Sequence, residues 1–301
     1  MISQQQLVLN CQKTPARKAW LENLPRLLVV GEFNSPTTRL LKELTDRWSL
    51  HLDHPFDSVG TCSWVAPVVR SNGVQAVLKL AMPHMEGQDE IKGLRLWNGR
   101  AMAKLLEADD ELGAMLLERC LPGTTLRSEP EPLQDEIIAS LLKRIWQPVG
   151  QSNGLPGFRP LSQMIECWRN ETIMQRNFWP DAGLVNEGLL LLEQLAHPSS
   201  TDALLTTDLH AENVLRSQRE PWLAIDPKPF VGDRSYDPVQ HLMNCETRLH
   251  RDPVALVERV AGLCEVDPER LRLWTFARAA ADPRDDWTNA RWNNIARALA
   301  P

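Results

Sequence analysis

Two short β-prone runs, residues 64–69 and 74–79, are separated by a turn that contains Asn72 and Gly73. This arrangement predicts an antiparallel hairpin, because Asn and Gly tolerate the positive φ angles that tight hairpin turns require. Residues 87–97 then show a helical pattern, and the apolar run 115–117 predicts a buried strand that enters a linker. The first part of the chain is therefore expected to form a small sheet with one accompanying helix.

The remaining apolar residues mostly follow a helical spacing. Stripes over residues 137–146 and 185–195 predict two helices in the second half of the chain. Two short apolar strands, 214–215 and 222–225, are joined by a polar turn and interrupt this pattern. Ahead of the sheet, residues 16–50 carry a helical period that is broken once, which predicts two further helices.

The length of the chain indicates two domains, because 301 residues exceed the usual size of a single hydrophobic core. Pro122 and Gly123 lie between the sheet-forming and the helical parts and mark the expected boundary. We therefore expect an α+β protein with an N-terminal lobe over residues 1–120 and a helical C-terminal lobe over residues 121–301. The linker between the lobes is expected at about residues 116–122.

The chain carries a formal net charge of −6 and has a pI near 5.7. This balance argues against a nucleic-acid partner, because such proteins concentrate Lys and Arg on one face, and it favours a cationic substrate. The six cysteines form no CxxC pair, so no zinc cluster or redox motif is expected. No apolar run approaches the roughly 18 residues of a membrane span, and no signal peptide pattern is present. We expect a cytoplasmic monomer or homodimer without a membrane partner.

Three polar residues in the second half carry the clearest chemical signal. Asp208 and Asn213 lie five residues apart in one loop, and Asp226 follows at the end of a short buried strand. Kinases use this arrangement, in which the first carboxylate accepts the proton of the attacking hydroxyl. The amide oxygen and the second carboxylate are hard ligands suited to Mg²⁺. The pattern therefore predicts phosphoryl transfer.

The chain resembles the aminoglycoside phosphotransferase superfamily, and within it the streptomycin 6-kinase or aminoglycoside/hydroxyurea resistance kinase branch. The resemblance runs from Trp64 to Trp292 and keeps the order of elements. It rests on the runs 76–80, 93–99, 116–119 and 225–233, and on Tyr236-Asp237. It implies a bilobal protein-kinase-like fold, with ATP and Mg²⁺ between the lobes. It also implies transfer of the γ-phosphoryl group to a hydroxyl of an aminoglycoside-like, cationic or polyhydroxylated small molecule.

The resemblance also assigns roles to single residues. Asp208 is similar to the catalytic base, and Asn213 and Asp226 to the Mg²⁺ ligands. Lys79 resembles the strand lysine that contacts the α- and β-phosphates, with Glu90 as its helix partner and Glu86 as the competing choice. The remaining nucleotide contacts implied are the hinge over Glu118 to Cys120 and the phosphate-covering segment 57–63, which includes Ser58, Gly60 and Ser63.

The chain departs from the pattern of these relatives at two places. Thr206-Thr207 stands where relatives usually have His-Gly before the catalytic Asp, which puts the loop geometry and the rate in question. Glu212 adds a carboxylate next to the acceptor. His210 is expected to hydrogen-bond within the loop. Asp282, Asp285 and Asp286 are further candidates for binding a cationic substrate, with an exposed turn as their alternative role. Asp237 is expected mainly as a helix N-cap. Its alternative roles are to hold the catalytic loop by accepting its backbone N–H groups, and to bind the substrate.

Two other functions remain open from the residues. One is a kinase-shaped protein that binds nucleotide or a small molecule without transferring phosphate, in line with the Thr206-Thr207 change. The other is a metabolic kinase for an endogenous sugar or amine, because acceptor pockets vary on a shared scaffold. The intact set Lys79, Asp208, Asn213 and Asp226 argues against the first of these.

Overall fold

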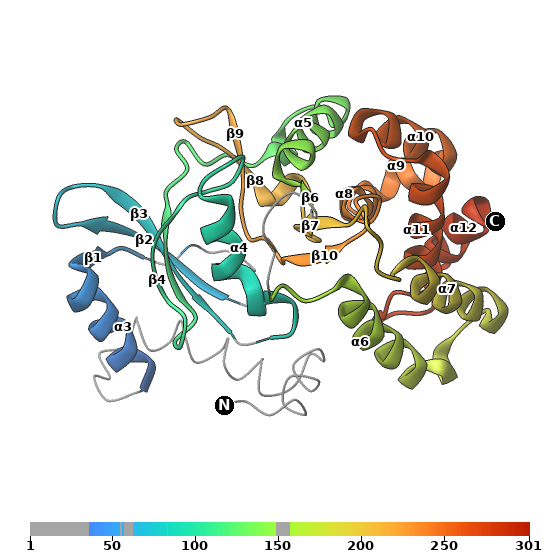
Figure 1. Cartoon of the computed structure of the whole chain (residues 1–301), viewed down its shortest axis with the longest axis horizontal. Coiled ribbons are helices and arrows are strands. Elements are labelled where there is room, and N and C mark those ends of the chain that lie inside the picture. Colours follow the sequence, from blue (N-terminus) through green and yellow to red (C-terminus); the bar gives the residue numbers. More distant parts are fainter. Residues whose placement is uncertain (1–35, 55, 57–62, 83, 149–156) are drawn as a thin grey trace. The chain divides into compact units, whose positions relative to one another are not determined.

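The computed structural model describes residues 36–54, 56, 63–82, 84–148 and 157–301. The chain forms two compact units (Figure 1). The first comprises Met1–Gly99 and Ala103–Leu121, and the second comprises Arg100–Met102 and Pro122–Pro301. Within the described residues, no helix is both long enough and apolar enough to cross a membrane.

The first unit is built on a five-stranded antiparallel sheet with the strand order β1-β2-β3-β5-β4. The strands are β1 Leu50–Leu52, β2 Ser63–Arg70, β3 Gln75–Ala81, β4 Leu105–Asp109 and β5 Ala114–Glu118. Two helices accompany the sheet, α3 Pro36–Trp48 and α4 Glu90–Trp97, and a 3₁₀ turn at Glu86–Asp89 precedes α4. The predicted hairpin, the helix near residue 90 and the strand near residue 116 are therefore confirmed. The first of the two expected N-terminal helices lies outside the described residues.

One face of this sheet forms the core of the unit. Alternate residues of β2 and β3 are buried because successive side chains of a strand point to opposite faces. Leu41 and Leu44 of α3 pack against this face. The strand residues in the cluster are Leu50 of β1, Trp64, Ala66 and Val68 of β2, Ala76, Leu78 and Leu80 of β3, and Ala114 and Leu116 of β5. Lys79 lies between two of these apolar positions, so its side chain belongs to the opposite face of β3.

The turn of the hairpin differs from the expected two-residue type. Gly73 has a φ of 81°, whereas Asn72 does not have a positive φ. The Asn72 side chain instead accepts a hydrogen bond from the Val74 N–H at 3.1 Å. The Gly73 N–H donates to the Arg70 carbonyl at 2.8 Å. The turn is therefore a three-residue loop in which only the glycine has the left-handed conformation, and this is a common alternative hairpin geometry.

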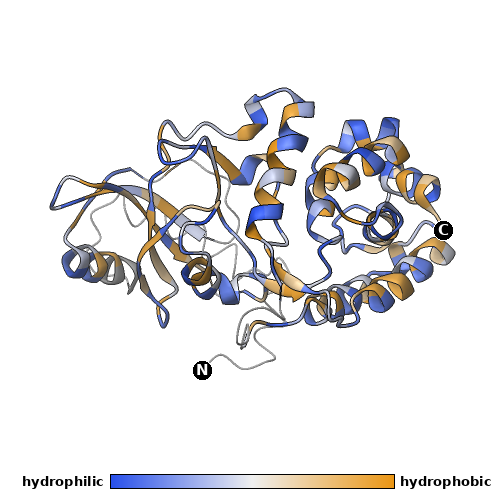
Figure 2. Cartoon of the chain, turned by 45° about the horizontal axis from the view of Figure 1, so that its top comes forward, coloured by the Kyte–Doolittle hydropathy of each residue, from blue (hydrophilic) through white to orange (hydrophobic). Residues whose placement is uncertain are grey.

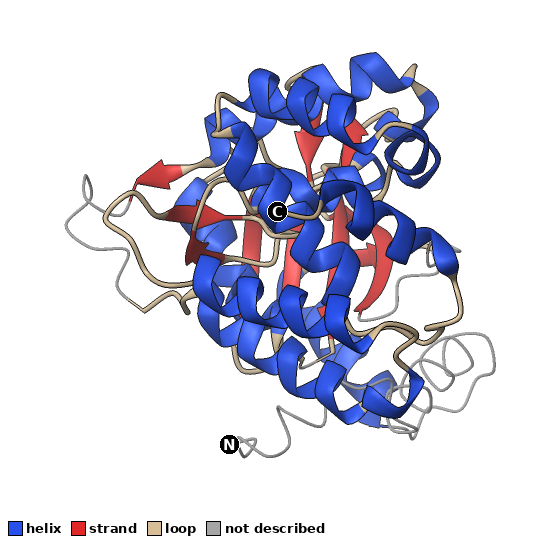
Figure 3. Ribbon diagram, turned by 90° about the vertical axis from the view of Figure 1, so that its right-hand side faces the viewer, coloured by secondary structure: helices blue, strands red, loops and turns tan. Residues whose placement is uncertain are grey.

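The second unit is mainly helical, and Figure 3 shows its helices on the side that faces the viewer. The helices are α5 Glu131–Ile145, α6 Leu161–Met174, α7 Ala182–Leu195, α8 Asp237–Met243, α9 Glu246–Arg251, α10 Pro253–Cys264, α11 Pro268–Ala281 and α12 Ala290–Leu299. The helices predicted from the stripes over residues 137–146 and 185–195 are confirmed as α5 and α7. Each helix presents an apolar side, as the hydropathy colours in Figure 2 indicate.

Helices α7 and α11 pack closely because small residues line their contact. A Cβ atom at Gly188 of α7 would lie 2.8 Å from the Cβ of Ala280 and 3.1 Å from the carbonyl oxygen of Ala277. The first distance is shorter than real Cβ contacts, and the second is tighter than most of them, so glycine permits this approach without a shift of the helices. The continuous leucine face of α7 is thereby buried against α11.

Five short strands position the loops of the second unit. Strands β6 Gln147–Pro148, β7 Ala203–Leu205 and β10 Phe230–Gly232 form a three-stranded sheet in the order β10-β7-β6. Strands β8 Val214–Arg216 and β9 Trp222–Ala224 form the predicted second hairpin, with Leu215 opposite Leu223. The loop that contains Asp208 runs from the end of β7 to the start of β8.

Candidate active site

In the first unit, Lys79 and Glu90 form a buried ion pair. The Lys79 Nζ lies 2.6 Å from the Glu90 Oε1, and the two side chains are only 7% and 4% exposed. Strand β3 supplies the lysine, and the first residue of α4 supplies the glutamate. A solvated lysine at a strand end is therefore excluded. Truncating one partner of such a pair leaves an uncompensated buried charge and costs about 3–5 kcal/mol.

The other expected nucleotide contacts of this unit are Ser58, Gly60, Ser63, Glu118 and Cys120. Ser58 and Gly60 lie outside the described residues, and Ser63 begins β2 opposite Ala81. The Glu118 N–H donates to the Lys104 carbonyl at 2.8 Å, and its carboxylate accepts from the Lys104 N–H. The Glu118 amide is therefore committed to the sheet and is not offered to a base. Cys120, two residues further on, is buried.

In the second unit, the carboxylate of Asp208 is held at both of its oxygens. The Gln240 Nε2 donates to Oδ1 at 2.8 Å, and the Lys228 Nζ lies 2.6 Å from Oδ2. The Asp208 side chain remains 15% exposed, so a ligand can reach it. Each carboxylate oxygen has two acceptor positions, and one position on each oxygen therefore remains for an incoming hydroxyl. Neither Lys228 nor Gln240 was identified from the sequence.

Asn213 lies between Asp208 and the other expected metal ligand, Asp226. Its Nδ2 donates to the Asp208 carbonyl at 2.9 Å, so its Oδ1 is the atom offered to a cation. Its own carbonyl accepts from the Ile225 N–H at 2.9 Å, which brings Asp226 next to it along the chain. Asp226 has a φ of 54°, a conformation that costs a non-glycine residue energy and that is common at functional sites. One amide oxygen and one carboxylate fit the ligand preference of Mg²⁺.

Asp237, at the start of α8, binds the loop that precedes Asp208. Its carboxylate accepts hydrogen bonds from the Thr206 N–H at 3.1 Å, the Thr207 N–H at 2.6 Å, the Thr206 hydroxyl at 3.2 Å and the Trp146 indole at 2.9 Å. Burial raises the pKa of this carboxyl, while the four donors act in the opposite direction. The side chain is 0% exposed, so a substrate contact is wrong for this residue. Asp237 does not cap α8 either. The expectation that it accepts backbone N–H groups of the loop is confirmed.

Thr206 and Thr207 stand where relatives usually have His-Gly. They form a hydrogen-bonded turn with an unfavourable backbone conformation at Thr207. Thr207 has a φ of 51°, and the Asp208 N–H donates back to the Thr206 carbonyl at 2.8 Å, which makes a γ-turn around Thr207. The Thr207 hydroxyl donates to the Lys228 carbonyl at 2.7 Å. The loop geometry is therefore maintained without the glycine that this backbone conformation favours.

His210 bonds within the loop through its backbone, because its carbonyl accepts from the Asn213 N–H at 2.9 Å. Its imidazole does not bond Asp208. Its Nε2 lies 4.0 Å from the Asp208 Oδ1, which is beyond hydrogen-bond length. Its Nδ1 is buried and has no hydrogen-bond partner among the described residues. Burial lowers the pKa of the imidazole despite the neighbouring carboxylates of Asp208 and Glu212. Burial therefore favours the neutral form of the ring beside the Asp208 carboxylate.

The candidates for binding a cationic substrate lie in different surroundings. Glu212 is 62% exposed and lies 3.7 Å from the Arg127 guanidinium. Asp285 and Asp286 are exposed, and Asp286 accepts from the N–H and hydroxyl of Thr288, as in an ordinary turn. Asp282 is bound at 2.8 Å by the buried Arg278. The structure does not gather these four acids into one cluster.

A chain of polar contacts connects Asp282 with the catalytic carboxylate. Arg278 bonds Asp282 on one side and donates to the Gln240 Oε1 at 2.9 Å on the other. Gln240 in turn donates to Asp208. Arg278 also lies over the rings of Trp168 and Tyr236. Because Arg278 is buried and has a raised pKa through its acidic neighbours, it is a permanently charged part of the scaffold behind Asp208.

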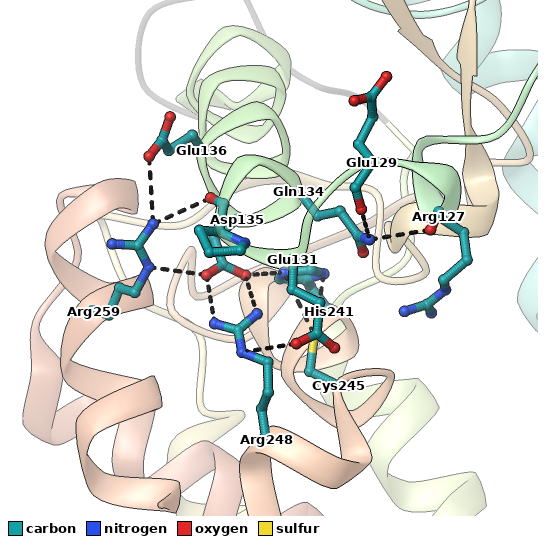
Figure 4. Close-up of polar contacts among 11 residues, drawn as sticks. Arg127, Glu129, Glu131, Gln134, Asp135, Glu136, His241, Cys245, Arg248 and Arg259 are labelled. Carbon is teal, nitrogen blue, oxygen red and sulfur yellow. Dashed lines mark hydrogen bonds and ion pairs between the residues drawn. The ribbon is translucent and has the colours of Figure 1, made fainter.

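Next to Gln240 on α8, His241 enters a buried ionic cluster (Figure 4). His241 Nε2 lies 2.8 Å from Asp135 of α5, and the guanidinium groups of Arg248 and Arg259 bind the same carboxylate. Burial disfavours the charged ring, but the hydrogen bond to Asp135 outweighs it and raises the pKa of His241 to about 9. Asp135, His241 and Cys245 have ligand atoms within 4.8 Å of one another. Two guanidinium groups and an imidazolium already neutralise Asp135, so the cluster is an ion-pair network.

Together, a buried lysine–glutamate pair on a small sheet and an Asp/Asn/Asp loop in a helical unit define a phosphotransferase with a protein-kinase-like fold. The model of the aminoglycoside/hydroxyurea antibiotic resistance kinase family matches residues 47–285. The chain belongs to this family. It is accordingly a small-molecule kinase with a hydroxyl acceptor, and the resemblance found in the sequence is confirmed.

Similar proteins agree with this assignment. The chain is 34% identical to a streptomycin 6-kinase from Streptomyces glaucescens, over 87% of this chain and 82% of that protein. It is also 34% identical to a hydroxyurea phosphotransferase from Kitasatospora aureofaciens, over 78% of this chain and 69% of that protein. Among solved structures, a choline kinase from Streptococcus pneumoniae has a TM-score of 0.61 at 18% identity, over 88% of this chain and 99% of that chain. The expected bilobal kinase-like fold class is thereby confirmed.

Proposed function

We propose that the chain transfers the γ-phosphoryl group of ATP to a hydroxyl of streptomycin or a closely related cationic aminoglycoside. The observation that carries the proposal is the carboxylate of Asp208, fixed at both oxygens beside Asn213 and left partly exposed. Two streptomycin 6-kinases, each 34% identical over 87% of the chain, support the acceptor class. The net charge of −6 suits a cationic acceptor.

In this proposal, Asp208 orients the acceptor hydroxyl and takes its proton as the oxygen attacks phosphorus. The bond between the γ-phosphorus and its bridging oxygen breaks, and ADP leaves. Lys79, oriented by Glu90, binds the α- and β-phosphates. Positioning and charge neutralisation provide most of the acceleration, because the protein forms no covalent intermediate.

Asn213 and Asp226 would hold Mg²⁺, through the amide oxygen and the carboxylate respectively. Bound there, the ion would neutralise charge on the phosphates. The Asn213 side chain is suited to this role because its nitrogen is already used by the Asp208 carbonyl. We place the reaction in the cytoplasm, where ATP is available, and expect no nucleic-acid or membrane partner.

A coupled ADP-release assay with MgATP tests the acceptor class. We expect streptomycin to stimulate ADP release well above the rate with water alone. The panel should include hydroxyurea, other aminoglycosides, choline and simple sugars. Stimulation by choline or a sugar without any by aminoglycosides would identify a metabolic kinase instead. Nucleotide binding by calorimetry without stimulation by any acceptor would favour a binding protein.

A further inference from the structure

We propose that Lys228 is a second catalytic residue, whose ammonium group contacts the γ-phosphoryl group during its transfer. The inference rests on the proposed kinase reaction and extends it by one residue. The ammonium group would then lie where negative charge develops on the oxygens of the transferring phosphoryl group. The residue is not one of the groups that the Asp/Asn/Asp pattern identifies, and its place in the site follows from the structure.

The first observation is the distance between the two charged groups. The Lys228 Nζ lies 2.6 Å from the Asp208 Oδ2, and the lysine side chain is 21% exposed. An exposed ion pair contributes little to stability, and a fully buried one is costly to desolvate. This pair lies between those limits, because both side chains are partly exposed. Stability alone does not account for its position.

The second observation is that the backbone of Lys228 is fixed to the catalytic loop. Its N–H donates to the Thr206 carbonyl at 2.8 Å, and its carbonyl accepts from the Thr207 hydroxyl at 2.7 Å. Prolines flank it at positions 227 and 229, which fix φ at those positions and hold Lys228 extended. The lysine and Asp208 are therefore held as one rigid pair, as electrostatic preorganisation requires.

The Lys228 ammonium group must also be close enough to contact the transferring phosphoryl group. An acceptor oxygen bound by Asp208 lies about 3 Å from the carboxylate. The phosphorus under attack lies about 3–3.5 Å from that oxygen in a reactive geometry. An ammonium group bonded to the same carboxylate is therefore within reach of the oxygens on phosphorus. Lys228 keeps its protons throughout, since Asp208 takes the proton of the acceptor and the electrons of the broken bond leave with ADP.

The competing explanation is that Lys228 only holds Asp208 in place. Both roles predict a lower kcat when the lysine is removed, so kcat alone does not separate them. A complex of ADP, Mg²⁺ and aluminium fluoride separates them, because the fluoride group mimics the transferring phosphoryl in the absence of an acceptor. Transition-state mimics bind more tightly than ground-state ligands when the site is complementary to the transition state. If Lys228 contacts the phosphoryl group directly, the gain in ADP affinity caused by aluminium fluoride should depend on the lysine.

The experiment compares Lys228→Met, Lys228→Arg and the surface control Lys143→Met, whose lysine pairs with the exposed Glu265. We expect Lys228→Met to lower kcat by about 10²–10³-fold, the loss typical of one preorganised electrostatic group. ADP affinity, measured by calorimetry, should stay within about threefold, while the tightening by aluminium fluoride is lost. Lys228→Arg should recover part of both quantities, and Lys143→Met should match the wild type.

Two results would overturn the proposal. One is unchanged aluminium fluoride tightening in Lys228→Met, whatever happens to kcat, since the lysine would then act only on Asp208. The other is a kcat that stays near the wild-type value. The fluoride measurement needs no acceptor, so it tests Lys228 even if streptomycin is not phosphorylated. Failure of the proposed acceptor is seen separately, in the wild-type protein.

Discussion

Thr207 illustrates how one residue can be both strained and well placed. Its φ of 51° is unfavourable for a β-branched side chain, and such conformations cost roughly 1–3 kcal/mol. The same residue makes two hydrogen bonds, from its N–H to Asp237 and from its hydroxyl to Lys228. The hydroxyl therefore offsets part of the strain and joins the loop to the segment after Asp226.

Substitutions at Thr207 should separate these two contributions. Thr207→Val keeps the strain but removes the hydroxyl, so we expect a loss of about 1–2 kcal/mol in the free energy of unfolding. Thr207→Gly removes the strain together with the hydroxyl, so its stability should stay within about 1 kcal/mol of the wild type. Urea denaturation measures both. Equal stability of the valine variant and the wild type would contradict this account of the turn.

At the scale of elements, the short helix α8 supplies two of the side chains that position Asp208. Asp237 at its start bonds the loop before Asp208, and Gln240 one turn later bonds the Asp208 carboxylate itself. His241 on the neighbouring side of the helix bonds Asp135 of α5. The helix has only seven residues, so its position depends on tertiary contacts more than on intrinsic helix stability. The ionic cluster around Asp135 is one of those contacts.

The charge of His241 should make stability depend on pH. Its pKa is about 9 in the folded chain, against 6.5 for an unperturbed histidine. Because the pKa is raised in the folded chain, protonated His241 stabilises the fold fully below pH 6.5. This contribution to the free energy of unfolding is lost as the pH rises through about 9. Stability measured by urea denaturation should therefore fall between pH 6.5 and 9.

The variant His241→Gln provides the control for this pH dependence. It removes the titrating ring, while Arg248 and Arg259 still neutralise Asp135. We therefore expect it to cost about 1–3 kcal/mol at pH 6.5, the loss typical of a buried hydrogen bond to a charged group. Its remaining stability should change much less with pH over the same range. Asp135 and Cys245 contact the ring, Arg248 and Arg259 bind Asp135, and all four residues remain unchanged. A variant with the same pH slope as the wild type would show that another group is responsible.

At the scale of the whole molecule, the sequence predicted those elements that have a local signal. The hairpins at Gly73 and at β8 and β9 have turn residues between apolar runs, α7 has an apolar stripe, and all three are confirmed. The sheet formed by β6, β7 and β10 was not predicted. Its strands have only two or three residues each, too few for a periodic pattern.

The site was partly accessible to the same reasoning. Asp208, Asn213 and Asp226 share a spacing that chemistry explains, and the family assignment agrees with it. Lys228 and Gln240 carry no such local signal, because their role depends on where the segment after β9 and helix α8 pack against the loop. The Asp-Pro-Lys run and the spacing from Asp237 to Gln240 on one helix face were the available hints.

Phosphoryl transfer by Asp208→Asn, measured with the acceptor found for the wild type and with MgATP, tests the central claim most directly. The exposed Asp110→Asn, in the first unit, is the matched control. The account predicts that Asp208→Asn loses about 10²–10⁴-fold in kcat, the usual contribution of a general base, while nucleotide affinity and the control remain at wild-type values. Transfer by Asp208→Asn at a rate close to that of the wild type would contradict it.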